Sequence, residues 1–173
     1  VVDILKESSN RGTLMHGYLS EMLMGKMNGE LIEEVNLPKK MAETIISHGL
    51  NDYVKEVYAS EECVYSLKYK YAGTMDALIS TQDNKLQICD FKQKNSPAKR
   101  EYSSIRNYFT QCILYAIAHN EIHGTKIQSS VILMCTPNLI FQKFEIEGQE
   151  FMDLQKEALE RVEHYHQLIG KNI

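Results

Sequence analysis

The segment spanning residues 71–94, YAGTMDALISTQDNKLQICDFKQK, constrains the fold more than any other part of the chain. Apolar residues at strand spacing on both sides of the polar run 81–84 predict two β-strands joined by a turn. Side chains alternate along a strand, so Asp90 and Lys92 lie on one face of the second strand. If the strands pair as a hairpin, Asp76 of the first strand meets Asp90 across the ladder. Two carboxylates beside an ammonium suit a hard divalent cation next to a phosphate, although a solvated hairpin edge with scattered charges accounts for the same residues.

Size and hydropathy place the chain among globular proteins. With 173 residues, 43% of them hydrophobic, the chain is long enough for one domain with a substantial core. No apolar run approaches the roughly 18 residues that a membrane span requires. The first ten residues, VVDILKESSN, lack the basic and apolar regions of a secretory signal. We therefore expect no membrane partner and a cytoplasmic location, or the host-cell cytoplasm if the gene belongs to a phage.

Cysteine spacing and net charge exclude several function classes. Each of the four cysteines (63, 89, 112 and 135) stands alone in an apolar segment, without a CxxC pair. This pattern argues against a zinc site, an iron–sulfur site or a disulfide framework, and predicts buried thiols in a reducing compartment. A net charge of −4 and a pI of about 5.9 are not those of a protein that coats nucleic acid. They leave a nuclease open, because a nuclease site needs carboxylates and only locally placed basic groups.

Hydrophobic periodicity and breaker residues predict helices and strands along the whole chain. The predicted elements are a lead-in over 1–9, a helix starting at 10–13, a break over 25–38 with a turn at Asn28-Gly29, a helix over 39–58, a strand over 61–69, the two hairpin strands, a helix over 98–123, a buried strand over 130–135, an outer strand over 139–146 and a helix over 149–169. The long helix before the buried strand is a crossover connection, which predicts that this strand runs parallel to the second hairpin strand.

The fold class that follows is α/β (α+β), with a central mixed β-sheet of about five strands flanked by helices. We expect a single domain over residues 1–173. Within it, the N-terminal helices occupy 10–58, the sheet core 61–146 and the C-terminal helix 149–169.

Four short motifs follow one another on these predicted elements. They are RGTLMH with His16, GTMD with Asp76, DFK with Asp90 and Lys92, and QCILY with Gln111 and Tyr115. Each motif alone is common, but in this order the set resembles the RecB-like branch of the PD-(D/E)xK nuclease superfamily. That branch includes RecB-type nuclease domains, CRISPR-associated RecB-like nucleases and the mitochondrial genome maintenance exonuclease. The resemblance covers about residues 11–146.

The resemblance implies a restriction-endonuclease-like core and a metal-dependent phosphodiester hydrolase. Asp76 and Asp90 match the metal-binding carboxylates, and Lys92 matches the catalytic lysine, for which we favour an electrostatic role. The backbone carbonyl of Phe91 and the side chain of His16 match further metal ligands. The expected cofactor is Mg²⁺ or Mn²⁺, as one or two ions. The cysteine trio of the iron–sulfur members is absent, so no cluster is expected.

Other positions match the family less directly. Gln111 and Tyr115 match the QxxxY motif, which in relatives supports the lysine region and contacts the nucleic-acid backbone. Glu62 is a weak match to an upstream acidic residue, and Glu61 competes with it. Four further histidines, at 119, 123, 164 and 166, are given no role.

The implied function is a DNA exonuclease acting on single-stranded ends in replication, recombination or repair, with DNA and replication or recombination proteins as partners. The alternatives are a structure-specific or restriction-type endonuclease and a catalytically inactive nucleic-acid-binding module. Basic and aromatic residues near the site are candidate DNA contacts, with a solvated charged face as the alternative. These residues are Arg11, Lys94, Lys99, Arg100, Tyr102, Arg106 and Tyr108.

Overall fold

A mixed five-stranded sheet with the strand order β1-β2-β3-β4-β5 organises the protein. The computed structural model describes residues 2–25 and 36–170, with side chains described from residue 5. Its elements are α1 (Val2–Leu23), α2 (Leu37–Ile45), the π-helical turn η1 (Ile46–Leu50), β1 (Val54–Ser66), β2 (Tyr71–Thr81), β3 (Leu86–Gln93), α3 (Ser103–His123), β4 (Ser129–Cys135), β5 (Phe141–Glu147) and α4 (Gly148–Gly170). The predicted fold class is confirmed.

Strand directions follow the lengths of the connections. Strand β1 pairs with β2, β2 with β3, and β4 with β5, all antiparallel. Strands β3 and β4 are parallel, with Cys89 opposite Val131 and Gln93 opposite Cys135. Helix α3 lies between these two strands in the sequence, so the predicted crossover is confirmed. The predicted hairpin is confirmed as well, and Asn84 completes its turn with a φ of 62°.

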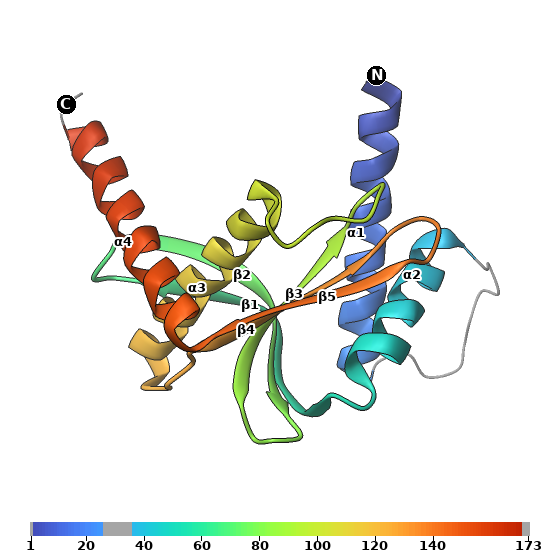
Figure 1. Cartoon of the computed structure of the whole chain (residues 1–173), viewed down its shortest axis with the longest axis horizontal. Helices are drawn as coiled ribbons and strands as arrows, with labels where there is room; N and C mark the ends of the chain where they lie inside the picture. The colour runs from blue at the N-terminus through green and yellow to red at the C-terminus, as the bar shows by residue number, and fades with distance from the viewer. Residues whose placement is uncertain (1, 26–35, 171–173) are drawn as a thin grey trace.

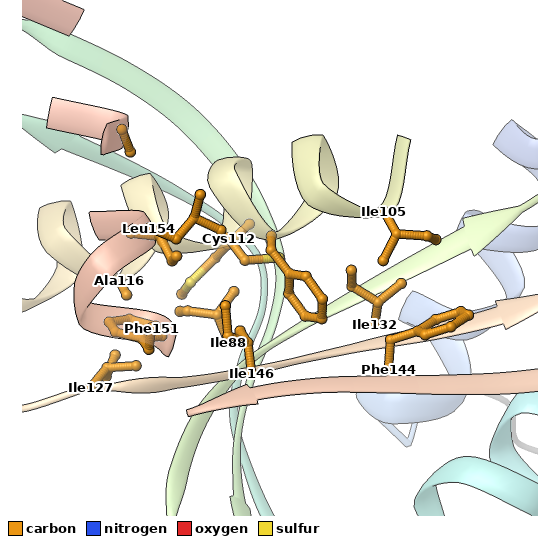
Figure 2. Close-up of a cluster of buried hydrophobic side chains, with 14 of the residues drawn as sticks. Ile88, Ile105, Cys112, Ala116, Ile127, Ile132, Phe144, Ile146, Phe151 and Leu154 are labelled. Atoms are coloured by element: carbon orange, nitrogen blue, oxygen red, sulfur yellow. The ribbon is translucent and has the colours of Figure 1, made fainter. Parts of the chain in front are cut away.

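Two pairs of helices cover the two faces of the sheet (Figure 1). On one face, Met15 of α1 and Met41 of α2 pack against strand residues that include Phe91. On the other face, side chains of α3 and α4 meet strand residues such as Ile88 and Ile132 (Figure 2). All seven residues of β4 are buried, because helices cover both faces of this interior strand. No helix within the described ranges combines the length and the hydropathy needed to cross a membrane.

Helix α1 begins at Val2, not at residues 10–13 as predicted. The polar residues that resemble N-caps lie inside the helix, and one of them, Ser8, has tertiary partners. The Ser8 hydroxyl lies 3.4 Å from both Gln93 Oε1 and Asn95 Oδ1, beyond the end of β3. A contact of this kind satisfies the hydroxyl without ending the helix.

The predicted helix over 39–58 is wrong in its second half. Helix α2 passes into η1 at Ile46, and the chain from Val54 onward belongs to β1. A Cβ on Gly49 would lie 2.9 Å from a ring carbon of Phe141, so this glycine allows η1 to pack on β5. Val54 and Val57 then pair with β2, because tertiary pairing outweighs the helical spacing of these apolar residues. The predicted Asn28-Gly29 turn lies outside the described residues.

Two smaller predictions also fail. Helix α3 begins at Ser103 and not at residue 98, because the backbone of Ala98 both donates to and accepts from the side-chain amide of Gln142 at 2.8 Å. This pairing holds the segment outside the helix. Cys63 is exposed, whereas the other three cysteines are buried as expected. Its neighbour Val64 takes the core side of the edge strand β1, so alternation turns Cys63 away from the core.

Candidate active site

The predicted carboxylates meet where strands β2 and β3 diverge. The β2–β3 ladder ends at the pair Ala77 and Cys89, one residue short of Asp76 and Asp90. Beyond that point, the N–H of Phe91 donates to Asp76 Oδ2 at 2.8 Å. The two carboxyl groups also lie close enough to shift each other's pKa. The hairpin therefore brings the two acids together through an opening of its ladder.

Asp90 is the most buried charged group of the site, with 3% of its surface exposed. Burial first, and then the charge of Asp76, raises the pKa of Asp90 to about 7. Lys92 Nζ lies 3.0 Å from Asp90 Oδ2 and forms an ion pair with it, and no other donor among the described residues reaches this buried oxygen. A buried carboxylate oxygen that only one ammonium approaches suits a hard cation.

His16 reaches this pair of acids from α1. Its Nδ1 lies 3.4 Å from Asp76 Oδ1, and its ring packs edge-on against Phe91, with 6.2 Å between the ring centroids. Burial alone lowers the pKa of His16, but the hydrogen bond and charge of Asp76 outweigh burial and raise it. In return, although burial raises the pKa of Asp76, its bond to His16 lowers that pKa below the ordinary value. Without metal and below about pH 7, the favoured charge state is therefore a His16–Asp76 ion pair beside a protonated Asp90.

Lys92 is held from its other side by α3. Its ammonium lies 3.4 Å from Gln111 Oε1 and 4.7 Å from the centroid of the Tyr108 ring. Gln111 Nε2 in turn donates to the Tyr115 hydroxyl at 2.8 Å. A Cβ on Gly73 would lie 2.6 Å from a ring carbon of Tyr115, so the glycine of GTMD makes room for this tyrosine. The QxxxY residues thus stand directly behind the lysine.

A cleft of about 770 Å³ opens beside His16 and Lys92. One face of α1 forms a wall of small side chains, and Glu61 of β1 lines the cleft as well. Glu61 has a φ of 51°, an uncommon backbone conformation for a residue with a side chain. The cleft is lined by Leu5, Ser8, Ser9, Gly12, Thr13, His16, Gly17, Glu61, Lys92 and Gln93. Of the two adjacent glutamates, Glu61 is therefore the one beside the site.

Glu62 lies in a different cluster. It pairs with Met75, whose side chain belongs to the α3 side of the sheet, and its Oε1 lies 3.7 Å from His123 Nε2. Ligand atoms of Glu62, His119 and His123 all lie within 4.8 Å of one another, a spacing that a metal ion can bridge. His16, Asp76 and Asp90, which are among the described residues, do not meet this spacing as a trio. The H-x-x-x-H spacing of the two histidines on one helix is the sequence signal that predicts such a pair.

The candidate DNA contacts divide into two groups. Three lie close to the site: Arg11, which donates to Asn95 at 2.6 Å, Lys94, which donates to Ser104 at 2.8 Å, and Tyr108. Arg100 and Arg106 instead pair with Glu150 and Glu157 of α4. Lys99 is exposed, and Tyr102, which is 45% exposed, is the residue before α3 and makes no side-chain capping hydrogen bond.

Comparison with known proteins adds support at the level of the fold. Neither a protein-family model nor a curated protein matches the chain. A crystal structure from Eubacterium rectale, described as a "putative exonuclease", is similar with a TM-score of 0.60 and 19% sequence identity over 92% of this chain and 66% of that one. The chain thus spans just under two-thirds of that protein's length. A structure described as SSO0001 has a TM-score of 0.38 and 16% identity over 71% of this chain and 55% of that one, which is too low to support an argument. The first likeness shows a shared mixed α/β fold.

Proposed function

We propose that the chain is a metal-dependent deoxyribonuclease of the RecB-like kind that removes nucleotides from single-stranded ends. The observation that carries the proposal is the convergence of Asp76, Asp90 and Lys92 at the opening between β2 and β3, with Gln111 holding the lysine from behind. A scattered set of surface charges has neither the burial nor the mutual contacts of these residues. The shared fold with a protein described as a putative exonuclease agrees with the proposal.

Asp76 and Asp90 are the residues that would hold Mg²⁺ or Mn²⁺, with the carbonyl of Phe91 and the ring of His16 as further candidates. When bound, such an ion lowers the pKa of a water and neutralises charge on a phosphate. Magnesium commonly takes one or two carboxylates and keeps several waters, so two acids suffice. The proton on Asp90 must leave for both acids to bind as carboxylates.

Lys92 acts as an electrostatic clamp on the phosphate. Burial alone would lower the pKa of Lys92, but the charge of Asp90 and their mutual contact raise it. The ammonium therefore stays charged, which favours stabilisation of the transition-state charge over removal of a proton from water. Gln111 and the Tyr108 ring orient this ammonium, because they hold it in one position beside the acids.

The cleft beside α1 is the path that we assign to the substrate strand. It ends at His16 and Lys92, and its small side chains leave room for a nucleic-acid backbone. We assign phosphate contacts to Arg11 and Lys94 and base stacking to Tyr108, because basic and aromatic side chains are the groups that bind single strands. The preference for free ends comes from the resemblance to the RecB-like branch.

The test compares end-labelled linear single-stranded DNA with a circular single strand, each with Mg²⁺, with Mn²⁺ and with EDTA. We expect metal-dependent release of label from the linear strand and an intact circle. Lys92→Ala should lower the cleavage rate by about 10³-fold, since one aligned charge donor contributes about that much in related chemistry. Lys156→Ala, a change of an exposed lysine on α4, is the matched control and should cleave like the parent.

Each alternative has its own outcome. Cleavage of the circle would replace the exonuclease with an endonuclease. Binding of DNA without cleavage under any metal condition would favour the inactive binding module. Cleavage that survives both EDTA and Lys92→Ala would remove the proposed mechanism.

A further inference from the structure

Helix α3 carries a row of polar residues at steps of four. Gln111 contacts Lys92, and Tyr115 contacts Gln111. His119 and His123 continue the row toward the end of the helix. Residues four apart lie on neighbouring turns of one helix face. The two histidine rings are accordingly adjacent, with 4.4 Å between their centroids. Only Gln111 and Tyr115, the first two residues of this row, belong to the candidate active site.

The tautomer of His119 is fixed by its neighbours. The backbone N–H of Ile127 donates to Asn120 Oδ1 at 2.8 Å, and Asn120 Nδ2 donates to the Ile127 carbonyl at 3.0 Å, so the amide has one orientation. The Thr125 hydroxyl donates its single proton to the same Asn120 Oδ1 at 2.8 Å. Because that proton is committed, Thr125 accepts at its contact with His119 Nδ1, which is 2.8 Å away. His119 therefore carries its proton on Nδ1, and the lone pair of Nε2 is free.

This arrangement is the one that metal-binding histidines adopt. Such a ring donates its second N–H to a fixed acceptor, which sets both the orientation and the tautomer of the ligand. His119 is only 6% exposed, so its position is set by packing.

Two further side chains complete the set of ligands, one from α3 and one from β1. His123 lies one turn further along α3, and Glu62 comes from the edge strand β1, with 3.7 Å between His123 Nε2 and Glu62 Oε1. Tetrahedral ligands at about 2.0–2.1 Å from an ion are about 3.4 Å apart, so ligand atoms within 4.8 Å of one another need small rotations. The side chains of His123 and Glu62 are 47% and 41% exposed and are free to make them.

We infer that His119, His123 and Glu62 bind one transition-metal ion of the Zn²⁺ class, which ties the end of α3 to β1. Two imidazoles and one carboxylate are a known ligand set for zinc, with the fourth position left to water. A simple ion pair between His123 and Glu62 would explain their contact but not the fixed orientation of His119. Imidazole ligands favour Zn²⁺ and Co²⁺, whereas paired carboxylates favour Mg²⁺ and Mn²⁺. The inference does not depend on the nuclease proposal.

The test uses Co²⁺ as a spectroscopic probe on the whole chain, with Zn²⁺ as the competitor. We expect visible absorption of tetrahedral type that saturates at one equivalent and disappears when Zn²⁺ is added. His123→Ala and Glu62→Gln change exposed side chains and should each weaken Co²⁺ binding at least about tenfold. His164→Ala, an exposed histidine on α4, is the matched control and should bind like the parent.

Two further variants separate this site from the carboxylate pair. Thr125→Val removes the acceptor for His119 Nδ1–H and should weaken Co²⁺ binding about tenfold, while far-UV circular dichroism reports the fold. Asp76→Asn should leave the Co²⁺ spectrum unchanged. An unchanged spectrum in both His123→Ala and Glu62→Gln, no tetrahedral spectrum at all, or its loss in Asp76→Asn would overturn the inference.

Discussion

The two halves of α3 serve two clusters with opposite chemistry. The first half faces a pair of carboxylates, of which Asp90 is buried, with a lysine, and the second half carries the buried His119 and the exposed His123 beside Glu62. Both sets include acidic oxygens, yet they differ in the partner atoms that complete them. Ligand type, more than charge alone, decides which divalent ion a protein site prefers. One helix therefore presents an oxygen site and a nitrogen site along a single row of side chains.

The two regions differ in how strongly burial affects their charged groups. At the first, burial of Asp90 beside Asp76 keeps one of the two acids protonated near neutral pH. At the second, Glu62 and His123 are about half exposed, and water screens their interaction. A metal ion bound at the buried carboxylates would offset the repulsion between them. At the exposed cluster, metal affinity depends mainly on the geometry of the ligands.

The largest expected effect is the loss of cleavage in Asp76→Asn, a change that should affect the carboxylate site and not the histidine cluster. Asp76→Asn keeps an oxygen that accepts the Phe91 N–H but removes the negative charge, so Mg²⁺-dependent cleavage should fall at least about 10³-fold. The Co²⁺ spectrum assigned to the histidine cluster should persist. Single-turnover cleavage and Co²⁺ titration of the same preparation measure both. Parental cleavage by the folded variant would remove Asp76 from the site.

A second prediction concerns pH and the free energy of unfolding in EDTA. Asp90 loses its proton near the ordinary value of 3.8 when the chain is unfolded and near about 7 when it is folded. Between these values only the folded chain holds the proton, so stability falls as the pH rises from about 4 to about 7. Above that range, Asp90 causes no further loss.

Asp90→Asn should therefore be more stable than the parent at pH 8, by on the order of 2 kcal/mol, and should differ less at pH 5. The titratable groups that interact with Asp90 are Asp76, Lys92, His16, Tyr115 and the buried thiols of Cys89 and Cys112. His16 has a raised pKa and loses its own stabilising charge as the pH rises, so a shallower slope remains. Urea denaturation at the two pH values measures the change, with Asp83→Asn in the exposed turn as the control. Parallel stability profiles for Asp90→Asn and the parent would contradict the raised pKa.

The smallest expected effect is that of Gly73→Ala on the cleavage rate, which tests whether a change at Tyr115 affects only the first half of α3. Gly73→Ala places a methyl group 2.6 Å from a Tyr115 ring carbon, so the ring must move away from Gln111. Loss of one orienting hydrogen bond should lower the cleavage rate about tenfold, which corresponds to about 1.4 kcal/mol. Co²⁺ binding four residues further along should not change.

The control for this prediction is a double-variant cycle. In a Tyr115→Ala background, Gly73→Ala has no ring to displace and should cost little. An equal cost of Gly73→Ala in both backgrounds would show that the glycine acts through something other than Tyr115.

Local sequence patterns were enough to predict most of the helices and strands and the elements that carry the candidate site residues. Alternation and the polar turn predicted β2 and β3, and the long helix expected before β4 predicted the parallel crossover. The same reasoning failed over residues 54–58, where apolar residues at helical spacing pair with β2 as an edge strand. Hydrophobic spacing alone does not distinguish a helix end from a strand that finds a partner far away in sequence.

The choice between the two glutamates shows what the sequence lacks. Glu61 and Glu62 are adjacent, and strand alternation says only that they point in opposite directions. Which of them faces the cleft depends on where β2 places Asp76 and where α3 places His123. The histidine pair was visible as a spacing, but its third partner lies 57 residues away from His119 on another element.

The sequence by itself determined the mixed α/β fold, the hairpin with its two acids and the helix behind the lysine, because these follow from local periodicity and short connections. Only the tertiary structure decided that the β2–β3 ladder opens at Asp76 and Asp90, that Gly73 makes room for Tyr115, and that Glu62 meets the histidines. The physical reason is that burial, charge coupling and close approach depend on distances between separate elements. Those distances are set by packing across the whole sheet and not by neighbouring residues.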